Sequence, residues 1–308
     1  MVDREDRRPA AALIAALIVG LALAAAAALP VVGDAASAAA APTAPSLFPI
    51  TIRDATGRDI TIPRAPRRII SLTPSVTEIL FALDLDPQLV GVSDADDYPP
   101  GRVAVKPRVG GVVINVERIV ALRPDLVIGM QSLQRDQLAR LEAARLTVLA
   151  VDAVSADETL AQIRLLGRAT GRVRQAAAVA ARLTRDLAAV RRTVRRSVYV
   201  EVWNEPFIAA ARGTLVDDLV ARAGGDNIFA DLQGYPQVSG ETIVARNPQV
   251  IFVLYPLRGG IAQRPAWGGI DAVRARRVDS LPASLVSRPG PRIGQGLALI
   301  WRGLQGAP

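Results

Sequence analysis

A twelve-residue segment occurs twice in the chain, and this repeat constrains the fold more than any other feature. The first copy starts at Glu117 (ERIVALRPDLVI) and the second at Glu241 (ETIVARNPQVIF), 124 positions later. Both copies place a glutamate at the start of a short helical segment and an apolar, strand-like segment after the proline. An internal repeat at this spacing predicts two related lobes, each containing one copy.

Short apolar segments alternate with helical segments on both sides of the repeat. The predicted strands are residues 68–72, 89–92, 125–130, 147–151, 198–203 and 250–254. Helices are predicted between them, for example over 133–144 and over 214–223, the latter ended by Gly224 and Gly225. Strands separated by helices favour parallel βαβ units, so the predicted fold class is α/β with mostly parallel sheets.

Two local signals add detail to this pattern. Isoleucines alternate with polar residues in 50–52 and 60–62 on either side of Asp54-Ala-Thr-Gly57, which predicts a β-hairpin. Ser75-Val-Thr-Glu78 has the spacing of a capping box and predicts a helix that follows from Ile79.

A long stretch without glycine or proline separates the two halves. Gly171 ends a predicted helix, and residues 172–196 then place apolar side chains on one helical face. If they are helical throughout, these residues span roughly 37 Å, which suits a rigid strut between lobes. We therefore predict a lobe over 50–171, a connecting helix over 172–196 and a lobe over 197–308.

The first 38 residues are typical of an export signal. Residues 1–8 are charged, residues 9–32 are uncharged and apolar, and Ala36-Ser-Ala38 resembles a small-residue cleavage site. Residues 39–49 are predicted to be a linker. We expect a cleaved signal peptide and a periplasmic or otherwise extracytoplasmic location. The alternative is a membrane anchor through residues 9–32, because an apolar stretch of this length can span a bilayer.

The composition excludes several classes of protein. The chain has no cysteine and no histidine, which excludes disulfides, thiol nucleophiles, Ser-His-Asp triads and Cys/His zinc sites. No phosphate loop, nucleophile elbow or dinucleotide fingerprint occurs. We therefore expect no enzyme, no catalytic residue and no cofactor, with carboxylate-only acid–base chemistry as the remaining enzymatic alternative. The net charge of +8 comes from scattered arginines, so no nucleic-acid partner is predicted.

One acidic cluster invites a metal interpretation. Asp94, Asp96 and Asp97 lie close together in the sequence, as the ligands of a calcium or magnesium site can. The cluster lacks the glycine and the distal glutamate of a calcium loop. Turn capping is the preferred interpretation, and no metal site is predicted.

Six segments of the chain carry a family pattern. They are Arg67–Glu78 (RRIISLTPSVTE), Asp97–Pro100 (DYPP), Asn115–Asp125 (NVERIVALRPD), Ala223–Phe229 (AGGDNIF), Tyr235–Ser239 (YPQVS) and Arg288–Arg292 (RPGPR). In order and spacing they resemble the periplasmic cobalamin-binding proteins of ABC importers, within the wider family of helical-backbone siderophore and cobalamin receptors. The resemblance extends from about Ile50 to the end of the chain.

The resemblance implies a class III solute-binding protein, with two α/β lobes, a rigid connecting helix and a ligand cleft between the lobes. It also implies that Glu117 and Glu241 dock onto arginines of a permease dimer. Taken alone, either glutamate can equally be a helix cap, since acids are favoured in a first helical turn. The expected function is extracytoplasmic capture of cobalamin or another corrinoid for an ABC importer. Contact with the membrane is expected only through the transporter or an uncleaved N-terminal segment.

Candidate ligand contacts follow from the position of aromatic residues. Open α/β sheets bind ligands at the carboxyl ends of their strands, and Tyr98, Trp203 and Tyr235 lie in or beside such loops. Arg288 is placed to meet a polar or anionic edge of the ligand. The alternative interpretations are that the aromatics cover their own lobes and that Arg288 is an ordinary surface arginine.

Two departures from the family pattern leave the ligand open. Residues 110–114 (GGVVI) contain no aromatic, where cobalamin-binding relatives often have one before the first docking glutamate. Ser284 stands where some relatives carry an acid. A ferric siderophore is therefore the alternative ligand.

Overall fold

The computed structural model of the protein describes residues 47–192, 194–257 and 260–306. The predicted signal peptide, and most of the linker after it, lie outside these residues. The described part begins with the predicted hairpin, which is confirmed: β1 (Ile50–Arg53) pairs antiparallel with β2 (Asp59–Ile62). The carboxylate of Asp54 closes the turn by accepting hydrogen bonds from the main-chain N–H groups of Thr56 and Arg58, at 2.8 and 3.0 Å.

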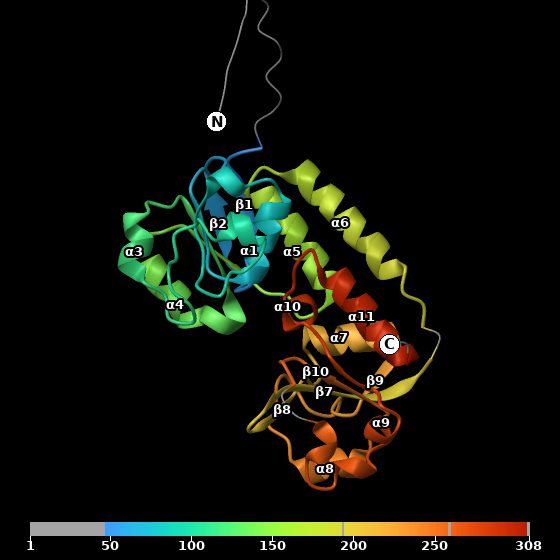
Figure 1. The fold of residues 1–308 in the computed structure, drawn as a ribbon. Coiled ribbons are helices and arrows are strands. Elements are labelled where there is room, and N and C mark those ends of the chain that lie inside the picture. The colour runs from blue at the N-terminus through green and yellow to red at the C-terminus, as the bar shows by residue number, and fades with distance from the viewer. Residues whose placement is uncertain (1–46, 193, 258–259, 307–308) are drawn as a thin grey trace, which may run out of the picture. The chain divides into compact units, whose positions relative to one another are not determined.

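In the described residues, the first half of the chain builds a four-stranded parallel sheet in the order β4-β3-β5-β6. Its strands are β3 (Ile69–Ser71), β4 (Leu89–Gly91), β5 (Leu126–Met130) and β6 (Val148–Val151). The helices that connect, cover or follow them are α1 (Pro74–Ala82), α2 (Pro100–Val103), α3 (Val116–Ala121), α4 (Gln131–Ala143) and α5 (Ala156–Ala169). Figure 1 shows α3 and α4 on one side of this half.

The second half contains a five-stranded sheet in the order β11-β10-β7-β8, with β9 also paired to β7, as far as the described residues extend. Its strands are β7 (Arg196–Asn204), β8 (Phe207–Ala209), β9 (Gly225–Asn227), β10 (Val250–Val253) and β11 (Val278–Ser280). Among the described strands of this sheet, only the β7–β8 pair is antiparallel, so the predicted α/β class with mostly parallel sheets is confirmed. The helices are α7 (Leu215–Ala223), α8 (Gly240–Arg246), α9 (Asp271–Arg274), α10 (Ala283–Val286) and α11 (Ile293–Gln305).

The central strands of both sheets are buried on both faces, as strands of parallel sheets usually are. Along β5, Leu126 and Ile128 belong to one hydrophobic cluster, whereas Val127 between them packs in another with Leu138 and Leu141 of α4. Strands β7 and β10 alternate in the same way between two clusters. Because successive side chains point to opposite faces and both faces are buried, these strands are uninterrupted apolar segments in the sequence.

The connection between the halves is a shorter helix than the sequence predicts. The helix α6 covers Val173–Ala188, and Arg196 already belongs to β7, so the prediction of one helix over 172–196 is wrong. A continued helix would place two pairs of arginines four residues apart, and like charges at this spacing destabilise a helix. The main-chain oxygen of Arg191 instead accepts a hydrogen bond of 2.8 Å from the indole of Trp301 in α11.

Helices from both halves share one hydrophobic cluster. Helix α5 packs on α6 and α7, and α11 packs on α6 and α7, and buried side chains of all four belong to the same cluster. The last helix of the chain therefore contacts the helix that leaves the first half (Figure 1). This packing brings the segment before α11 against α1, where the candidate site lies.

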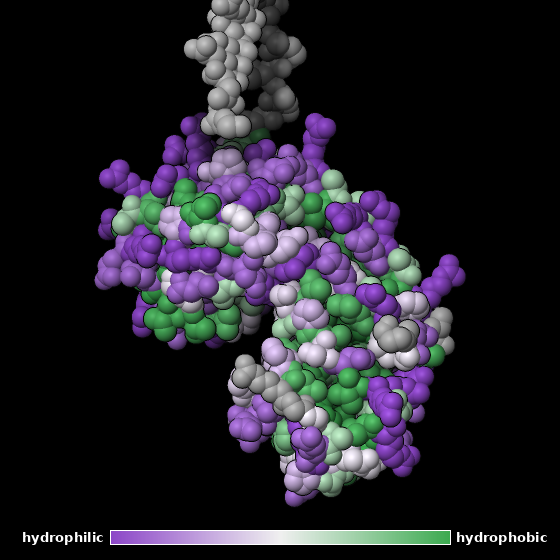
Figure 2. Space-filling model, in the orientation of Figure 1, coloured by the Kyte–Doolittle hydropathy of each residue, from purple (hydrophilic) through white to green (hydrophobic). Residues whose placement is uncertain are grey.

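Polar and apolar residues are unevenly distributed over the visible surface. Figure 2 shows polar residues over much of the face, with apolar residues gathered beside α4 and over the second half. Leu133 of α4 is one of the exposed apolar residues, as are Val112 and Val113 in the loop before α3. Within the described residues, no helix combines the length and the apolar character that crossing a membrane requires.

Candidate functional site

The site begins with a buried glutamate in α1. This helix starts at Pro74, with Thr73 as an extended N-cap residue that makes no side-chain capping bond. The predicted capping box at Ser75–Glu78 is therefore wrong: Glu78 lies in the second turn, and its side chain is only 2% exposed. A buried carboxylate requires charged partners, and these come from the other half of the chain.

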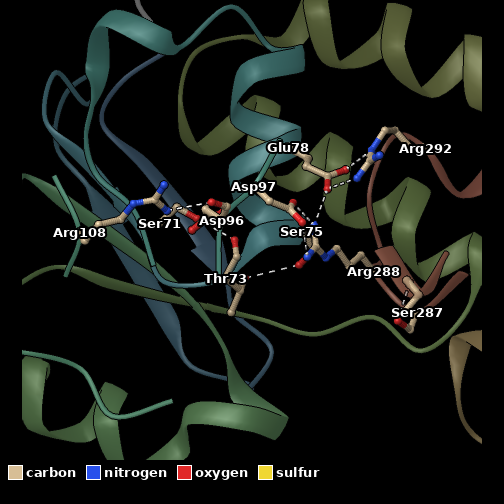
Figure 3. Close-up of polar contacts among 11 residues, drawn as sticks. Ser71, Thr73, Ser75, Glu78, Asp96, Asp97, Arg108, Ser287, Arg288 and Arg292 are labelled. Carbon is tan, nitrogen blue, oxygen red and sulfur yellow. Dashed lines mark hydrogen bonds and ion pairs between the residues drawn. The ribbon is translucent and has the colours of Figure 1, made fainter. Parts of the chain in front are cut away.

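Two arginines supply those partners. Arg292, directly before α11, donates from Nε to Oε2 of Glu78 at 2.8 Å and from Nη2 to Oε1 at 2.5 Å. Arg288, in the bend after α10, adds a bond from Nη1 to Oε1 at 3.3 Å. Figure 3 shows both arginines directed at Glu78. Because the partners lie more than 200 positions apart in sequence, this cluster fastens the end of the chain to the first half.

The loop between β4 and α2 completes the cluster. Asp97 accepts two bonds from Arg288, at 2.5 and 3.2 Å (Figure 3). The hydrogen bond from Arg288 holds the pKa of Asp97 below its usual range. Next to it, the ring of Tyr98 lies under the guanidinium of Arg292, 4.0 Å from its carbon to the ring centroid, and 41% of Tyr98 remains exposed. The structure therefore brings together two of the predicted ligand contacts, Tyr98 and Arg288.

The preceding residue, Asp96, is buried at 4% exposure. Burial raises the pKa of its carboxyl group. Arg108 donates to the main-chain oxygens of Ser93 and Asp96, each at 2.8 Å, and so fixes the shape of the loop. Asp94 is exposed, so the three aspartates occupy three different environments. The described residues contain no group of three or more acidic side chains that could hold a metal ion.

A cavity of about 330 Å³ borders the same cluster. Its walls include Glu78, Tyr98 and Arg292, together with Arg102 of α2 and Arg182 of α6. Arg102 is paired with Asp86 and lies over the ring of Phe81. The cavity thus combines aromatic and guanidinium surfaces.

The other two predicted aromatic contacts belong to the second half. Trp203 stands at the end of β7 and is 53% exposed, and Tyr235, in the loop between β9 and α8, is 50% exposed. Trp203 packs on Tyr255, with ring centroids 5.8 Å apart, and its indole donates to the main-chain oxygen of Glu205. The alternative that these side chains cover their own core fits Trp203 in part, because it rests on Tyr255. Half of each side chain nevertheless faces solvent.

A second buried carboxylate supports this aromatic wall, and sequence analysis did not identify it. The side chain of Glu201 in β7 is fully buried and accepts two bonds from Arg264, at 2.7 and 2.8 Å. The hydroxyl groups of Tyr199 and Tyr255 also donate to Glu201. Burial, and then the nearby Glu201, raises the pKa of Tyr255 to about 12. A lone acid inside the apolar strand sequence VYVEVW was the available signal.

The two repeated glutamates occupy equivalent places. Glu117 and Glu241 are exposed in the first turns of α3 and α8. In each helix the N-cap is a residue other than the glutamate. Asn115 accepts a hydrogen bond from the N–H of Arg118, and Ser239 accepts one from the N–H of Thr242. The capping role is therefore already filled in both copies, and the glutamate side chains are directed to solvent.

Comparison with known proteins agrees with this architecture. The model of the periplasmic binding protein family matches residues 69–285. An ABC transporter substrate-binding lipoprotein of Bacillus subtilis, YvrC, is 34% identical over 264 residues, covering 82% of this chain and 84% of the relative.

Two solved structures show the same fold. The vitamin B12-binding protein BtuF of Vibrio cholerae superposes with a TM-score of 0.72 at 30% identity, covering 78% of this chain and 97% of the other. The heme-binding protein RhuT of Roseiflexus has a TM-score of 0.70 at 30% identity, with coverages of 78% and 99%. The chain therefore belongs to the periplasmic binding protein family, as an extracytoplasmic substrate-binding protein of the ABC-transporter type.

Proposed function

We propose that this protein captures a corrinoid outside the cytoplasm and delivers it to the permease of an ABC importer. The observation that carries the proposal is the half-exposed ring of Tyr98, held in place by Arg292 beside Arg288. Bulky, partly apolar ligands are well bound by aromatic faces with a few placed polar groups. The segments that supply these residues, DYPP and RPGPR, resemble the cobalamin-binding branch of the family.

The second half would supply the opposite wall of the site. Trp203 and Tyr235 are each about half exposed, although aromatic residues make up only 4% of the sequence. Exposed aromatic rings offer flat apolar faces on which a large ligand can pack. We assign both side chains to packing on the ligand and Arg288 to its polar rim.

Delivery requires contact with the permease. Glu117 and Glu241 are exposed acids in equivalent helices, and neither is needed as a cap. A pair of carboxylates on two related surfaces fits a partner that presents basic groups on two related surfaces. We therefore propose these two glutamates as docking residues.

A ferric siderophore is the second candidate ligand. The loop before α3 presents Val112 and Val113, exposed at 68% and 73%, where an aromatic would be expected for cobalamin. Valine side chains are smaller than an aromatic ring, so they leave a wider surface and offer no flat face to the ligand. This observation supports a cobamide variant or a ferric siderophore as the alternative to cobalamin.

Tryptophan fluorescence tests the ligand assignment. The chain has three tryptophans: Trp203 is half exposed, Trp267 is buried at 2% exposure, and Trp301 lies in α11 outside the proposed site. A bound corrinoid should therefore quench mainly Trp203. We expect saturable quenching of the mature protein by cyanocobalamin, corrected for inner-filter absorption. The quenching should disappear in the double variant Tyr98→Ala/Tyr235→Ala and persist in Leu133→Ala, a matched removal of an exposed apolar side chain. A flat cyanocobalamin curve beside a saturating ferric-siderophore curve would refute the corrinoid.

Charge reversal tests the docking assignment. Glu117→Arg and Glu241→Arg should keep their affinity for the ligand but fail to support its uptake by cells that carry the cognate permease. Asp136→Arg, at an exposed position of α4, is the control and should support normal uptake. Loss of ligand binding by purified Glu117→Arg would place that residue in the ligand site instead.

A further inference from the structure

The charges around Arg288 and Arg292 balance one another. Two guanidinium groups meet two carboxylates, Glu78 and Asp97, through five hydrogen bonds. The two carboxylates differ in their access to water, since the side chain of Glu78 is 2% exposed and that of Asp97 is 61% exposed. Glu78 therefore belongs to the permanent framework, whereas Asp97 lies on the solvent side of Arg288.

The position of Asp97 is fixed by its own loop. Arg108 holds the main-chain oxygens of Ser93 and Asp96, and Tyr98 is stacked under Arg292. The carboxylate of Asp97 is thus presented to Arg288 by residues on both sides of it. Since the bond from Arg288 lowers its pKa, Asp97 remains ionised at neutral pH.

Building on the proposed function, we propose that Asp97 is a specificity-determining residue that excludes ligands with free carboxylates. A ligand carboxylate that approaches Arg288 must replace Asp97 or lie beside it, and two carboxylates in one site repel each other. A neutral amide meets no such repulsion. The guanidinium has five N–H groups, so an amide oxygen can accept from one of them while Asp97 stays in place. The site therefore selects a bulky ligand with an uncharged, amide-rich rim.

The test compares two large macrocycles of opposite character. Hemin carries two carboxylates, and cyanocobalamin carries neutral amides around its ring. The variant Asp97→Asn removes the charge and keeps the shape, and Asp94→Asn makes the same change at an exposed position of the same loop. We expect Asp97→Asn to bind hemin about tenfold more tightly than the wild type, while its Kd for cyanocobalamin changes less than about threefold. Asp94→Asn should match the wild type for both.

Two further variants tie the effect to Arg288. Adding Arg288→Gln to Asp97→Asn should return the hemin affinity to the wild-type level, because the uncompensated guanidinium is then gone. Asp97→Glu keeps the charge and should continue to exclude hemin. Thermal unfolding of each variant establishes that it is folded before binding is compared.

Three results would overturn the proposal. The first is an unchanged hemin affinity in folded Asp97→Asn. The second is an equal rise of the hemin affinity in Asp94→Asn, which indicates a general charge effect. The third is the loss of cyanocobalamin binding in Asp97→Asn, which makes Asp97 a ligand contact. A wild type that does not bind cyanocobalamin would refute the corrinoid proposal alone. The hemin comparison among wild type, Asp97→Asn and Asp94→Asn would still decide the role of Asp97.

Discussion

Glu78 in the first half and Glu201 in the second are both buried carboxylates that accept two bonds from one arginine, but their arginines come from different parts of the chain. Glu78 is held by Arg292, 214 positions later, and Glu201 by Arg264, 63 positions later. The first pair connects the two halves. The second stays within one half and braces the segment that carries Tyr255 beneath Trp203. A buried carboxylate bound by one arginine thus fixes the two halves to each other in the first case. In the second case it supports the aromatic residues of the proposed site.

The comparison predicts that Glu201 contributes most to stability. Glu201→Ala leaves Arg264 and two tyrosine hydroxyls without their acceptor, and one of these tyrosines, Tyr199, is fully buried. Removing one member of a buried ion pair costs about 3–5 kcal/mol, and we expect a loss of this size in the free energy of unfolding in urea. Glu241→Ala, an exposed glutamate of the same half, is the control and should change stability by less than about 0.5 kcal/mol. Equal losses in the two variants would show that the buried network is not a stabilising unit.

Glu78→Ala should have a smaller effect on total stability and a different kind of effect on unfolding. Without Glu78, Arg288 keeps its two bonds to Asp97, so only Arg292 loses its carboxylate partner. We expect a loss of about 1–3 kcal/mol, the usual cost of leaving buried polar groups without partners.

Because Glu78 connects the halves, its loss should also uncouple them. The unfolding transition of Glu78→Ala should broaden or split when followed by hydrogen exchange in each half, whereas Glu201→Ala should unfold in one step. A single sharp transition in both variants would contradict the different roles assigned to the two glutamates.

Local features of this fold were predictable from sequence because their causes lie within a few residues. The hairpin turn depends on Asp54, which bonds residues two and four positions later. Helix α7 ends at Gly224, which adopts a positive φ of 98° that suits glycine. The strands were recognised because both faces are buried, which requires continuous apolar segments.

Distant partners explain the failures. Glu78 was assigned to a capping box because Ser75 precedes it by three residues, yet its partners lie more than 200 positions away. Helix α6 was predicted too long because no glycine or proline marks its end, while Trp301 engages the chain at Arg191. Tyr98 and Arg288 were predicted as ligand contacts and lie in one cluster, which remains a candidate site, but the bond of Arg288 to Asp97 had no sequence signal.

The smallest predicted effect concerns Asp96 and Asp97, which are adjacent and should respond to pH in opposite directions. Arg288 lowers the pKa of Asp97 below the ordinary 3.8, so its contribution to stability is present above about pH 4 and is lost as the pH falls through the lowered value. Asp97→Asn should therefore cost stability at neutral pH, and the cost should vanish in acid. The pair is partly exposed, so we expect about 0.2–1 kcal/mol.

Burial raises the pKa of Asp96 above 3.8, so the native state holds its proton more firmly than the unfolded chain does. The wild type then loses stability as the pH rises from about 4 through the raised pKa. Asp96→Asn cannot ionise, and relative to the wild type it should be more stable at pH 7 than at pH 4. Urea unfolding of both variants between pH 3 and pH 7 tests this, with Asp94→Asn as the control for the same substitution at an exposed position of the loop. If the change in stability between pH 4 and pH 7 had the same sign for Asp96→Asn and Asp97→Asn, one shared environment would govern both carboxylates. Burial of Asp96 and ion pairing of Asp97 would then not be the separate causes.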